Sequence, residues 1–236
     1  MDEEVDWDRE ADNWVRWART AGHDAYWQYR GAFFEVIVPA PGRRTVEVGC
    51  GEGRVARDLQ ERGHLVVAVD RSLKLLGYAK AADREGTYVQ ANGSRLPMSD
   101  ASCDLVVAYN TLMDVADLPG TVAEVARILE PRGRFCVCVT HPLNDAGKFV
   151  GTEPGAVFEI AGSYFGRRRF EGTFERDGLS MTFRGWSSPL EEYVVAFERA
   201  GLLVEMIREP VPVATTGRYT AWHRIPMFLH ARLIKP

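Results

Sequence analysis

The sequence predicts an α/β fold built on a doubly wound, mostly parallel sheet. Five short apolar runs recur over about one hundred residues with helical patterns between them, which is typical of parallel strands covered by helices on both faces. A Gly-rich turn joins the first run to the first helix, where open sheets of this kind place a ligand. With 236 residues, 46% of them hydrophobic and 26% charged, the chain suffices for a domain with a sizeable core.

The elements follow in order along the chain. Ser72 is the expected N-cap of one helix, Gly63 ends the helix before it, and Pro189 and Gly201 bracket a later one. Strands are expected at 45–49, 64–70, 87–91, 104–110 and 135–141, helices at 54–62, 72–82, 119–129 and 189–200, and two last strands at 202–209 and 225–235.

Two segments lie outside this alternation. Aromatic residues recur at helical spacing up to the breaker Pro39-Ala-Pro41-Gly42, so we expect a helical N-terminal cap over residues 1–40. Residues 142–188 show no sustained period, and a loop of that length is uncommon unless it is functional, so we expect a lid or insertion there. The single domain then consists of these two segments, a ligand-binding core at 43–141 and a C-terminal helix and strands at 189–236.

Charge and composition limit the kinds of partner that we expect. The net charge of −4 offers no basic surplus for a nucleic-acid backbone, and we expect no nucleic-acid partner. No apolar run reaches the length of a membrane span, and the acidic, Trp-bearing first twenty residues are unlike a leader peptide, so a cytoplasmic protein is expected. The four cysteines lack zinc-site spacing, and we expect buried thiols and no metal.

The run from Glu47 to Gly53 carries the functional argument. Its glycines are spaced Gly-x-Gly-x-Gly after a buried strand and before a helix, which lets the backbone approach a bound molecule. The dinucleotide pattern would need glycine where Arg54 stands, and no phosphate loop is present. Asp70 ends the second strand, where a carboxylate can accept both hydroxyls of a ribose. The plain alternative is a structural turn followed by a solvated aspartate.

With these residues the sequence resembles the class I S-adenosylmethionine-dependent methyltransferases over about residues 43 to 141. EVGCGEG at 47–53 is similar to the first motif of that family, AVD at 68–70 to the second, and ANGSRLP at 91–97 to the third. DLVVAYNTLMDV at 104–115 and RILEPRGRF at 127–135 resemble the fourth motif and the turn before strand five. The resemblance implies seven strands, the last one antiparallel, and one bound S-adenosylmethionine.

The resemblance also implies roles for individual residues. Gly49, Gly51 and Gly53 would line the methionine part of the cofactor with Glu47 beneath it, and Asp70 would hold the ribose. Asn92 stands where the family usually has Asp, so we expect an amide contact to the adenine amino group without the assistance of a charge. The complete expected cofactor set is Glu47, Gly49, Cys50, Gly51, Gly53, Asp70, Arg71, Leu73, Asn92, Gly93, Asn110 and Thr111.

The sequence gives fewer signals for the residues that would bind the methyl acceptor. His141 ends strand five at the substrate edge of the sheet and is the candidate base, with a hydrogen-bonded strand terminus as its alternative. Asp114 could orient a polar substrate or simply be solvated or cap a helix. Tyr26 or Trp27 could stack beside a sulfonium, since aromatic faces attract cations, and Tyr164 would suit an apolar or aromatic substrate.

The leading hypothesis is an enzyme that methylates a small, apolar or aromatic metabolite by direct in-line transfer. No catalytic triad is needed, because the cofactor carries its own activation and the protein aligns the reactants and excludes water. A cofactor-binding protein that does not transfer methyl, and a protein methyltransferase, stay open as alternatives. A nicotinamide oxidoreductase is the third hypothesis, and Arg54 counts against it. Neither the acceptor atom nor the oligomeric state can be predicted.

Overall fold

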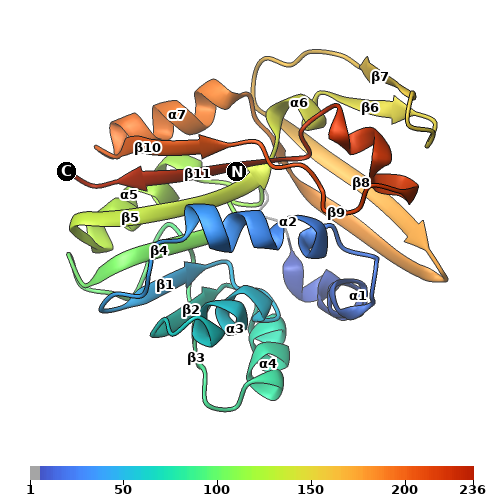
Figure 1. Ribbon diagram of the computed structural model, residues 1–236. Helices are drawn as coiled ribbons and strands as arrows, with labels where there is room; N and C mark the ends of the chain where they lie inside the picture. Colours follow the sequence, from blue (N-terminus) through green and yellow to red (C-terminus); the bar gives the residue numbers. More distant parts are fainter. Residues whose placement is uncertain (1–5) are drawn as a thin grey trace.

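A twisted seven-stranded sheet forms the centre of the protein, and helices lie on both of its faces (Figure 1). The structure is a computed structural model and describes residues 6–236. In spatial order the strands are β10 (Leu203–Arg208), β11 (Phe228–Ile234), β5 (Leu129–Thr140), β4 (Cys103–Tyr109), β1 (Thr45–Val48), β2 (Val66–Asp70) and β3 (Thr87–Gln90).

The connections between strands define one edge of the sheet as the place for a ligand. β1 pairs in parallel with β2 on one side and with β4 on the other, so the chain reverses its direction of winding at the carboxyl ends of β1 and β4. β11 runs antiparallel to β5, from Phe228 opposite Thr140 to Ile234 opposite Arg134. The predicted fold class, with seven strands and an antiparallel last strand, is confirmed.

Side chains that alternate along the central strands pack into two cores, one on each face. Val106 and Ala108 of β4 face a core that includes Tyr193 and Phe197, whereas Leu105 and Val107 face the opposite one. The first face is covered by α5 (Leu118–Ile128) and α7 (Leu190–Arg199). The second is covered by α2 (Tyr26–Ala32), η1 (Phe33–Ile37) and α3 (Arg54–Glu61). Asp117 caps α5 by accepting a hydrogen bond from the N–H of Gly120.

The N-terminal segment is helical and lies beside the Gly-rich turn. α1 (Trp7–Arg19) packs against α4 (Leu73–Ala82) on one side and against a later hairpin on the other. Asp12 fixes the first contact, because its carboxylate accepts hydrogen bonds from the Lys74 ammonium group and the Tyr78 hydroxyl group, each at 2.8 Å. The first five residues of the predicted cap lie outside the described residues.

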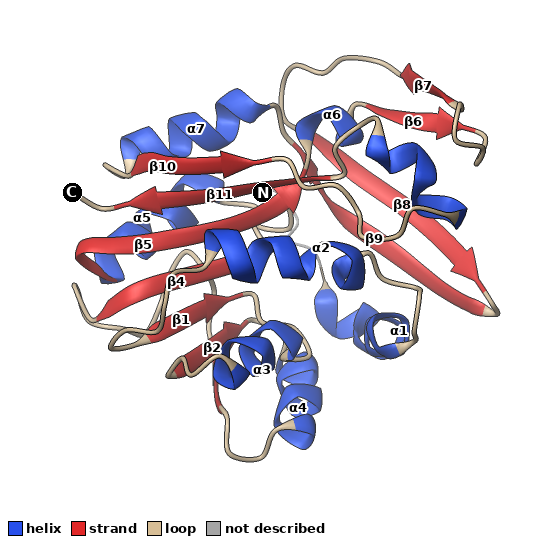
Figure 2. Ribbon diagram, in the orientation of Figure 1, coloured by secondary structure: helices blue, strands red, loops and turns tan. Residues whose placement is uncertain are grey.

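Residues 142–188 are more regular than the sequence pattern predicts. They form the short helix α6 (Pro142–Asp145), a hairpin of β6 (Gly147–Val150) and β7 (Val157–Ile160), and a longer hairpin of β8 (Arg168–Arg176) and β9 (Leu179–Ser187). Figure 2 shows the β8–β9 hairpin projecting beyond the central sheet with α1 beside it. The sequence did not predict these strands, because β8 exposes side chains on both faces and so lacks the alternation of apolar and polar residues that marks a strand.

The described residues contain none of the long apolar helices that a bilayer crossing requires. All four cysteines are free thiols and are buried, as expected. A seven-residue 3-10 helix, η2 (Gly217–His223), precedes β11, so the last strand begins at Phe228 and not at the predicted residue 225.

Candidate functional site

The Gly-rich loop, residues 49–53, turns between β1 and α3 with its backbone fixed to β2. The N–H groups of Gly49 and Cys50 both donate to the carbonyl of Val69, at 2.8 and 3.0 Å. The space next to Gly49 is filled by the protein, since a Cβ there would lie 2.3 Å from the Thr111 methyl group. Gly51, with φ +54°, has no such neighbour, and its nearest atom is the indole nitrogen of Trp14 at 3.5 Å. The open side of the loop is therefore at Gly51.

Asp70 connects this loop to the end of β2. Its carboxylate accepts one hydrogen bond from the Gly51 N–H at 2.7 Å and one from the Ser72 N–H at 2.8 Å. The side chain is buried, and burial raises the pKa of the carboxyl despite these bonds. Each oxygen still has a lone pair for a further donor. Asp70 thus lies next to the Gly-rich loop, and its carboxylate can accept hydrogen bonds from two ribose hydroxyl groups.

Glu47 lies beneath the loop and is almost completely enclosed, with 1% of its surface exposed. Its Oε2 has no hydrogen-bond partner among residues 6–236. Burial, and the neighbouring negative charge of Asp70, raise the pKa of this carboxyl to about 8. A buried acid without a donor is unfavourable unless a ligand supplies one, and an ammonium group would do so. Glu47 therefore fits the amino group of a methionine moiety.

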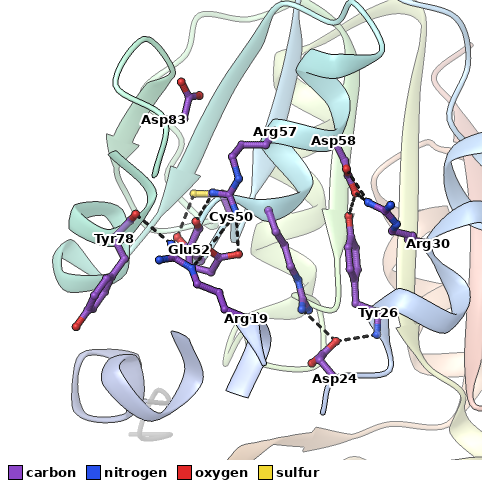
Figure 3. A network of polar contacts seen from close by, with 12 residues as sticks. Arg19, Asp24, Tyr26, Arg30, Cys50, Glu52, Arg57, Asp58, Tyr78 and Asp83 are labelled. Atoms are coloured by element: carbon purple, nitrogen blue, oxygen red, sulfur yellow. Dashed lines mark hydrogen bonds and ion pairs between the residues drawn. The ribbon is translucent and has the colours of Figure 1, made fainter. Parts of the chain in front are cut away.

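The N-terminal cap, described over residues 6–38, is held to α3 by three polar contacts in succession. Glu52 binds the guanidinium groups of Arg19 and Arg57, Arg54 pairs with Asp24 at 3.1 Å, and Asp58 accepts from Tyr26 and Arg30 (Figure 3). The Glu52 and Asp58 carboxylates are buried, whereas the guanidinium groups of Arg19 and Arg30 are partly exposed, so removing either arginine would leave a buried carboxylate with fewer partners. The cap is therefore part of the site and not a loose appendage.

Arg54 and Trp14 close the loop from the side of the cap. The Arg54 guanidinium lies over the Trp14 ring at 4.9 Å and over the Tyr26 ring at 4.3 Å. In the sequence, Arg54 counted only against a dinucleotide motif, and Trp14 was one of several aromatic residues of the expected cap, so neither was predicted to border the loop. The position of Arg54 directly after Gly53, at the start of α3, was the available signal.

The predicted adenine side is an open pocket of about 310 Å³ lined by Arg71, Gln90, Ala91 and Asn92. Asn92 Oδ1 accepts hydrogen bonds from the N–H and the hydroxyl of Ser94, at 3.0 and 3.1 Å. Leu73 is exposed at the start of α4, with 63% of its surface accessible, and Gly93 is half-buried next to Thr121. Arg71 and Asn92 are thus brought together at one pocket, and a nucleobase fits its size.

Asn110 and Thr111 follow β4 at the same edge of the sheet. Asn110 has a positive φ of +54° and its Oδ1 accepts from the Cys138 thiol at 3.2 Å, while Thr111 donates to the carbonyl of Val48 at 3.0 Å. Both side chains are committed to the protein. Thr111 therefore supports the Gly-rich loop from below, and Cys50, which is buried and donates to the Gly51 carbonyl, does so from within it.

Three of the expected acceptor-side residues have other roles in the structure. Tyr26 is buried and its hydroxyl donates to Asp58, and the exposed Trp27 carries the Arg30 guanidinium on its ring face. The Tyr164 hydroxyl accepts from the Leu190 N–H at the start of α7. These side chains pack the cap and fix the lid to α7, because their polar groups and ring faces already have partners.

The candidate base His141 is also occupied. Its Nδ1 accepts a hydrogen bond from the Leu143 N–H at 3.0 Å as the N-cap of α6, and its Nε2 donates to Glu209 at 2.9 Å. Burial lowers its pKa. Because each ring nitrogen has a protein partner, the structure favours the hydrogen-bonded alternative, with His141 as a helix cap, and its role as a base stays a prediction. Asp114 lies beneath the β8–β9 hairpin, where a Cβ on Gly185 would stand 2.9 Å from its Oδ1.

Comparisons with known proteins agree with this geometry. The model of a methyltransferase domain matches residues 46–137. An uncharacterized methyltransferase from Synechocystis is 34% identical over 109 residues (45% of this chain, 51% of that protein), and a demethylmenaquinone methyltransferase from Corynebacterium kroppenstedtii is 32% identical over 119 residues (50% of each). The chain spans about half the length of these curated relatives.

A solved structure extends the likeness to nearly the whole fold. An S-adenosylmethionine-dependent methyltransferase from Mesorhizobium loti superimposes with a TM-score of 0.69 at 26% identity, covering 89% of this chain and 98% of that one. Residues 46–137 thus match a methyltransferase domain, and the fold as a whole is shared with an S-adenosylmethionine-dependent methyltransferase. The predicted family and its cofactor, S-adenosylmethionine, are confirmed.

Proposed function

We propose that the protein transfers the methyl group of S-adenosylmethionine to a small organic acceptor. The observation that carries this proposal is the Gly51–Asp70 hydrogen bond, because it sets the open glycine of the loop and the ribose acceptor side by side. The unpartnered Glu47 beneath them and the pocket beside Asn92 supply places for the two ends of the cofactor. The cofactor, when bound, supplies an electrophilic methyl group on a sulfonium.

The residues of this chain would bind and orient the cofactor, and they would exclude water from it. Glu47 would hold the methionine ammonium group and Asp70 the ribose. Asn92 would line the place of the adenine, since its Oδ1 already accepts two hydrogen bonds from Ser94. Trp14 and Arg54 border the loop near Gly51, and Phe183 of the β8–β9 hairpin packs on Trp14. These groups would keep water away from the reacting atoms. In-line displacement from a sulfonium needs alignment more than acid–base assistance, which agrees with the engagement of His141 elsewhere.

Support for a small acceptor comes from the aromatic enclosure and from the relatives. Phe183 of β9 meets Trp14 and Trp17 edge to face at 6.1 and 6.2 Å, so the cap and the lid join in an aromatic cluster next to the loop. An apolar or aromatic metabolite would suit such walls. One relative methylates demethylmenaquinone, as its name states, and a malonyl-[acyl-carrier protein] O-methyltransferase from Serratia marcescens is 30% identical over 93 residues.

A pair of measurements tests the proposal. Calorimetry with S-adenosylmethionine and with NAD⁺ should show binding of the first only, and tight binding of NAD⁺ would overturn the assignment. S-adenosylhomocysteine formation over a panel of phenols, carboxylates, amines and peptides should then identify a small acceptor. Binding without transfer to any acceptor would favour a cofactor-binding protein that does not methylate, and transfer to peptides alone would favour a protein methyltransferase.

A further inference from the structure

The helix α1 lies between the cofactor side of the protein and the β8–β9 hairpin. Asp8 and Asp12 share one face of this helix. Glu10, Trp14 and Trp17 share the opposite face, since a helix turns by about 100° per residue. The helix packs on α4 and on β9. α1 therefore connects two parts of the chain that are far apart in sequence.

The first face of α1 is bound to the residues next to Asp70, the expected ribose acceptor. The Ser72 hydroxyl donates a hydrogen bond to the Asp8 carboxylate, and the Ser72 N–H donates to the Asp70 carboxylate at 2.8 Å. Ser72 also caps α4, because its hydroxyl accepts from the Leu75 N–H at 3.0 Å. A single serine thus separates α1 from the acid that would hold the ribose.

Trp14 gives α1 a second contact with the cofactor side. Its indole nitrogen lies 3.5 Å from the Cβ position of Gly51, the open glycine of the loop. Its ring meets Phe183 of β9 edge to face, with 6.1 Å between the ring centroids. A cofactor that passes Gly51 therefore meets the same side chain on which the hairpin packs.

An ion pair between Glu10 and Arg184 joins the second face of α1 to the hairpin. Arg184 Nη1 lies 2.9 Å from Glu10 Oε1, and Glu10 is buried, with 8% of its surface exposed. The same guanidinium contacts Glu171 across the hairpin at 3.1 Å, but 65% of the Glu171 side chain is exposed. An exposed ion pair contributes little, whereas loss of one partner of a buried carboxylate is costly. Glu10 is therefore the carboxylate that holds Arg184 in place.

The tip of the hairpin is held to the cap separately. The Arg176 guanidinium donates to the carbonyl of His23 at 2.6 Å and lies over the Trp17 ring at 5.0 Å. These contacts fix the tip to the turn after α1. The Glu10–Arg184 ion pair, in contrast, starts from the same face of α1 as Trp14.

The hairpin closes over the end of β4 directly beside this ion pair. The Trp186 N–H donates to the carbonyl of Met113 at 2.7 Å, and a Cβ on Gly185 would stand 2.9 Å from Asp114 Oδ1. Asp114 is a residue predicted for the acceptor side. Arg184 directly precedes Gly185 in β9, so its ion pair fixes the hairpin at the point where the hairpin covers Asp114.

We propose that Glu10 and Arg184 are positioning residues through which a bound cofactor holds the β8–β9 hairpin closed over the acceptor side. This inference rests on the proposed function and goes beyond it to the control of lid closure. A cofactor in the Gly-rich loop packs against Trp14 and so fixes α1, and the fixed helix holds Arg184 through Glu10. Because such coupling is reciprocal, an acceptor under the closed hairpin also tightens the binding of the cofactor.

Amide hydrogen exchange with and without S-adenosylhomocysteine tests the coupling without an acceptor. At a ligand concentration of about 100 times the dissociation constant, any opening that must release the ligand slows by about 100-fold. In the unaltered protein, the amides of the Gly-rich loop should slow strongly, and those of β9 by about fivefold or more. Glu10→Gln should keep the effect at the loop but reduce that at β9 to about twofold or less, because a neutral amide holds Arg184 more weakly. The quantity compared is the change that the ligand causes, so a general loss of stability does not imitate it.

Glu171→Gln is the matched control, because it removes the exposed carboxylate from the same guanidinium. It should leave the effect of the ligand on β9 as it is in the unaltered protein. Slowing at the loop but not at β9 in the unaltered protein would overturn the proposal, and so would equal slowing at β9 in Glu10→Gln and Glu171→Gln. The first of these results needs no variant. If the ligand does not slow exchange at the loop itself, the placing of the cofactor is wrong, and the proposed function fails together with the coupling.

Discussion

The indole nitrogen of Trp14 lies 3.5 Å from the place where a Cβ of Gly51 would stand. Residue 14 belongs to a helix near the N-terminus and residue 51 to the loop after β1, so this contact brings the cap onto the open face of the Gly-rich loop. Arg54 stacks on the same indole and pairs with Asp24 of the cap. Access to the loop therefore depends on how α1 is seated.

Gly51→Leu should reduce affinity for S-adenosylmethionine by about tenfold or more, which corresponds to about 1.4 kcal/mol. The added side chain would fill the gap between the loop and Trp14, where the cofactor has to pass. Calorimetric titration measures the effect. Gly201→Leu is the control, because Gly201 has a similar positive φ of +72° but no atom within 4 Å of its Cβ position. Equal affinities of the two variants would contradict the assignment of the loop.

Asp70→Ala should weaken binding of S-adenosylmethionine by about 1–3 kcal/mol, since ribose hydroxyls would lose their acceptor in an enclosed place. The Gly51 N–H loses its acceptor as well, so the loop should also lose thermal stability. Asp117→Ala is the control that separates the loss of affinity from the loss of stability. Asp117 caps α5 through the Gly120 N–H, away from the loop, so its removal should lower stability alone. An unchanged dissociation constant in Asp70→Ala would refute the ribose role.

The cofactor half of the site could be predicted because its signals are local in sequence. Strand, glycine loop, helix and Asp70 follow one another within one crossover, and parallel strands bring their carboxyl ends to one edge. The hydrogen bond from Gly51 to Asp70 is a consequence of that order. What the local pattern could not show is that a Cβ at Gly49 would collide with the Thr111 side chain.

The lid could be predicted only as an insertion, because its hairpins carry no regular period in the sequence. β8 exposes side chains on both faces, so it lacks the alternation that marks a half-buried strand. Asp114 was foreseen as a candidate for the acceptor side, but its neighbours under the lid were not. The two alternatives for His141 could not be separated in the sequence. Pro142 starts a new helix directly after β5, and the imidazole caps that helix.

Glu47→Gln should stabilise the cofactor-free protein by about 1–3 kcal/mol near pH 8, because a buried carboxylate without a donor is removed. The pKa of Glu47 is about 8 in the folded protein against an ordinary 4.5, so the folded state holds the proton more tightly. The free energy of unfolding of the wild type should therefore fall as pH rises from about 4.5 to about 8. The variant has no titrating group at this position, so its free energy of unfolding should fall less over the same range.

Urea unfolding at about pH 5 and about pH 8 measures this difference. Glu61→Gln is the control, since Glu61 is an exposed acid at the end of α3, the helix that follows the Gly-rich loop. S-adenosylmethionine should reverse the order of stabilities, because its ammonium group pairs with the Glu47 carboxylate and finds a weaker partner in the amide. Parallel pH profiles of the two proteins would show that Glu47 has an ordinary acidity.

His141→Ala should lower the free energy of unfolding by about 1 kcal/mol, as expected for the loss of a helix N-cap, and should leave the affinity for S-adenosylmethionine unchanged. The imidazole accepts from the Leu143 N–H and donates to Glu209, so its removal loosens α6 and, through it, the position of Asp145. His141→Asn supplies a side chain that can cap the helix but cannot act as a base near neutral pH. Its methyl-transfer rate and pH profile should match those of the wild type. If His141→Asn instead loses most of its turnover while its melting temperature is kept, the imidazole takes part in the reaction and the assignment of His141 as a cap is incomplete.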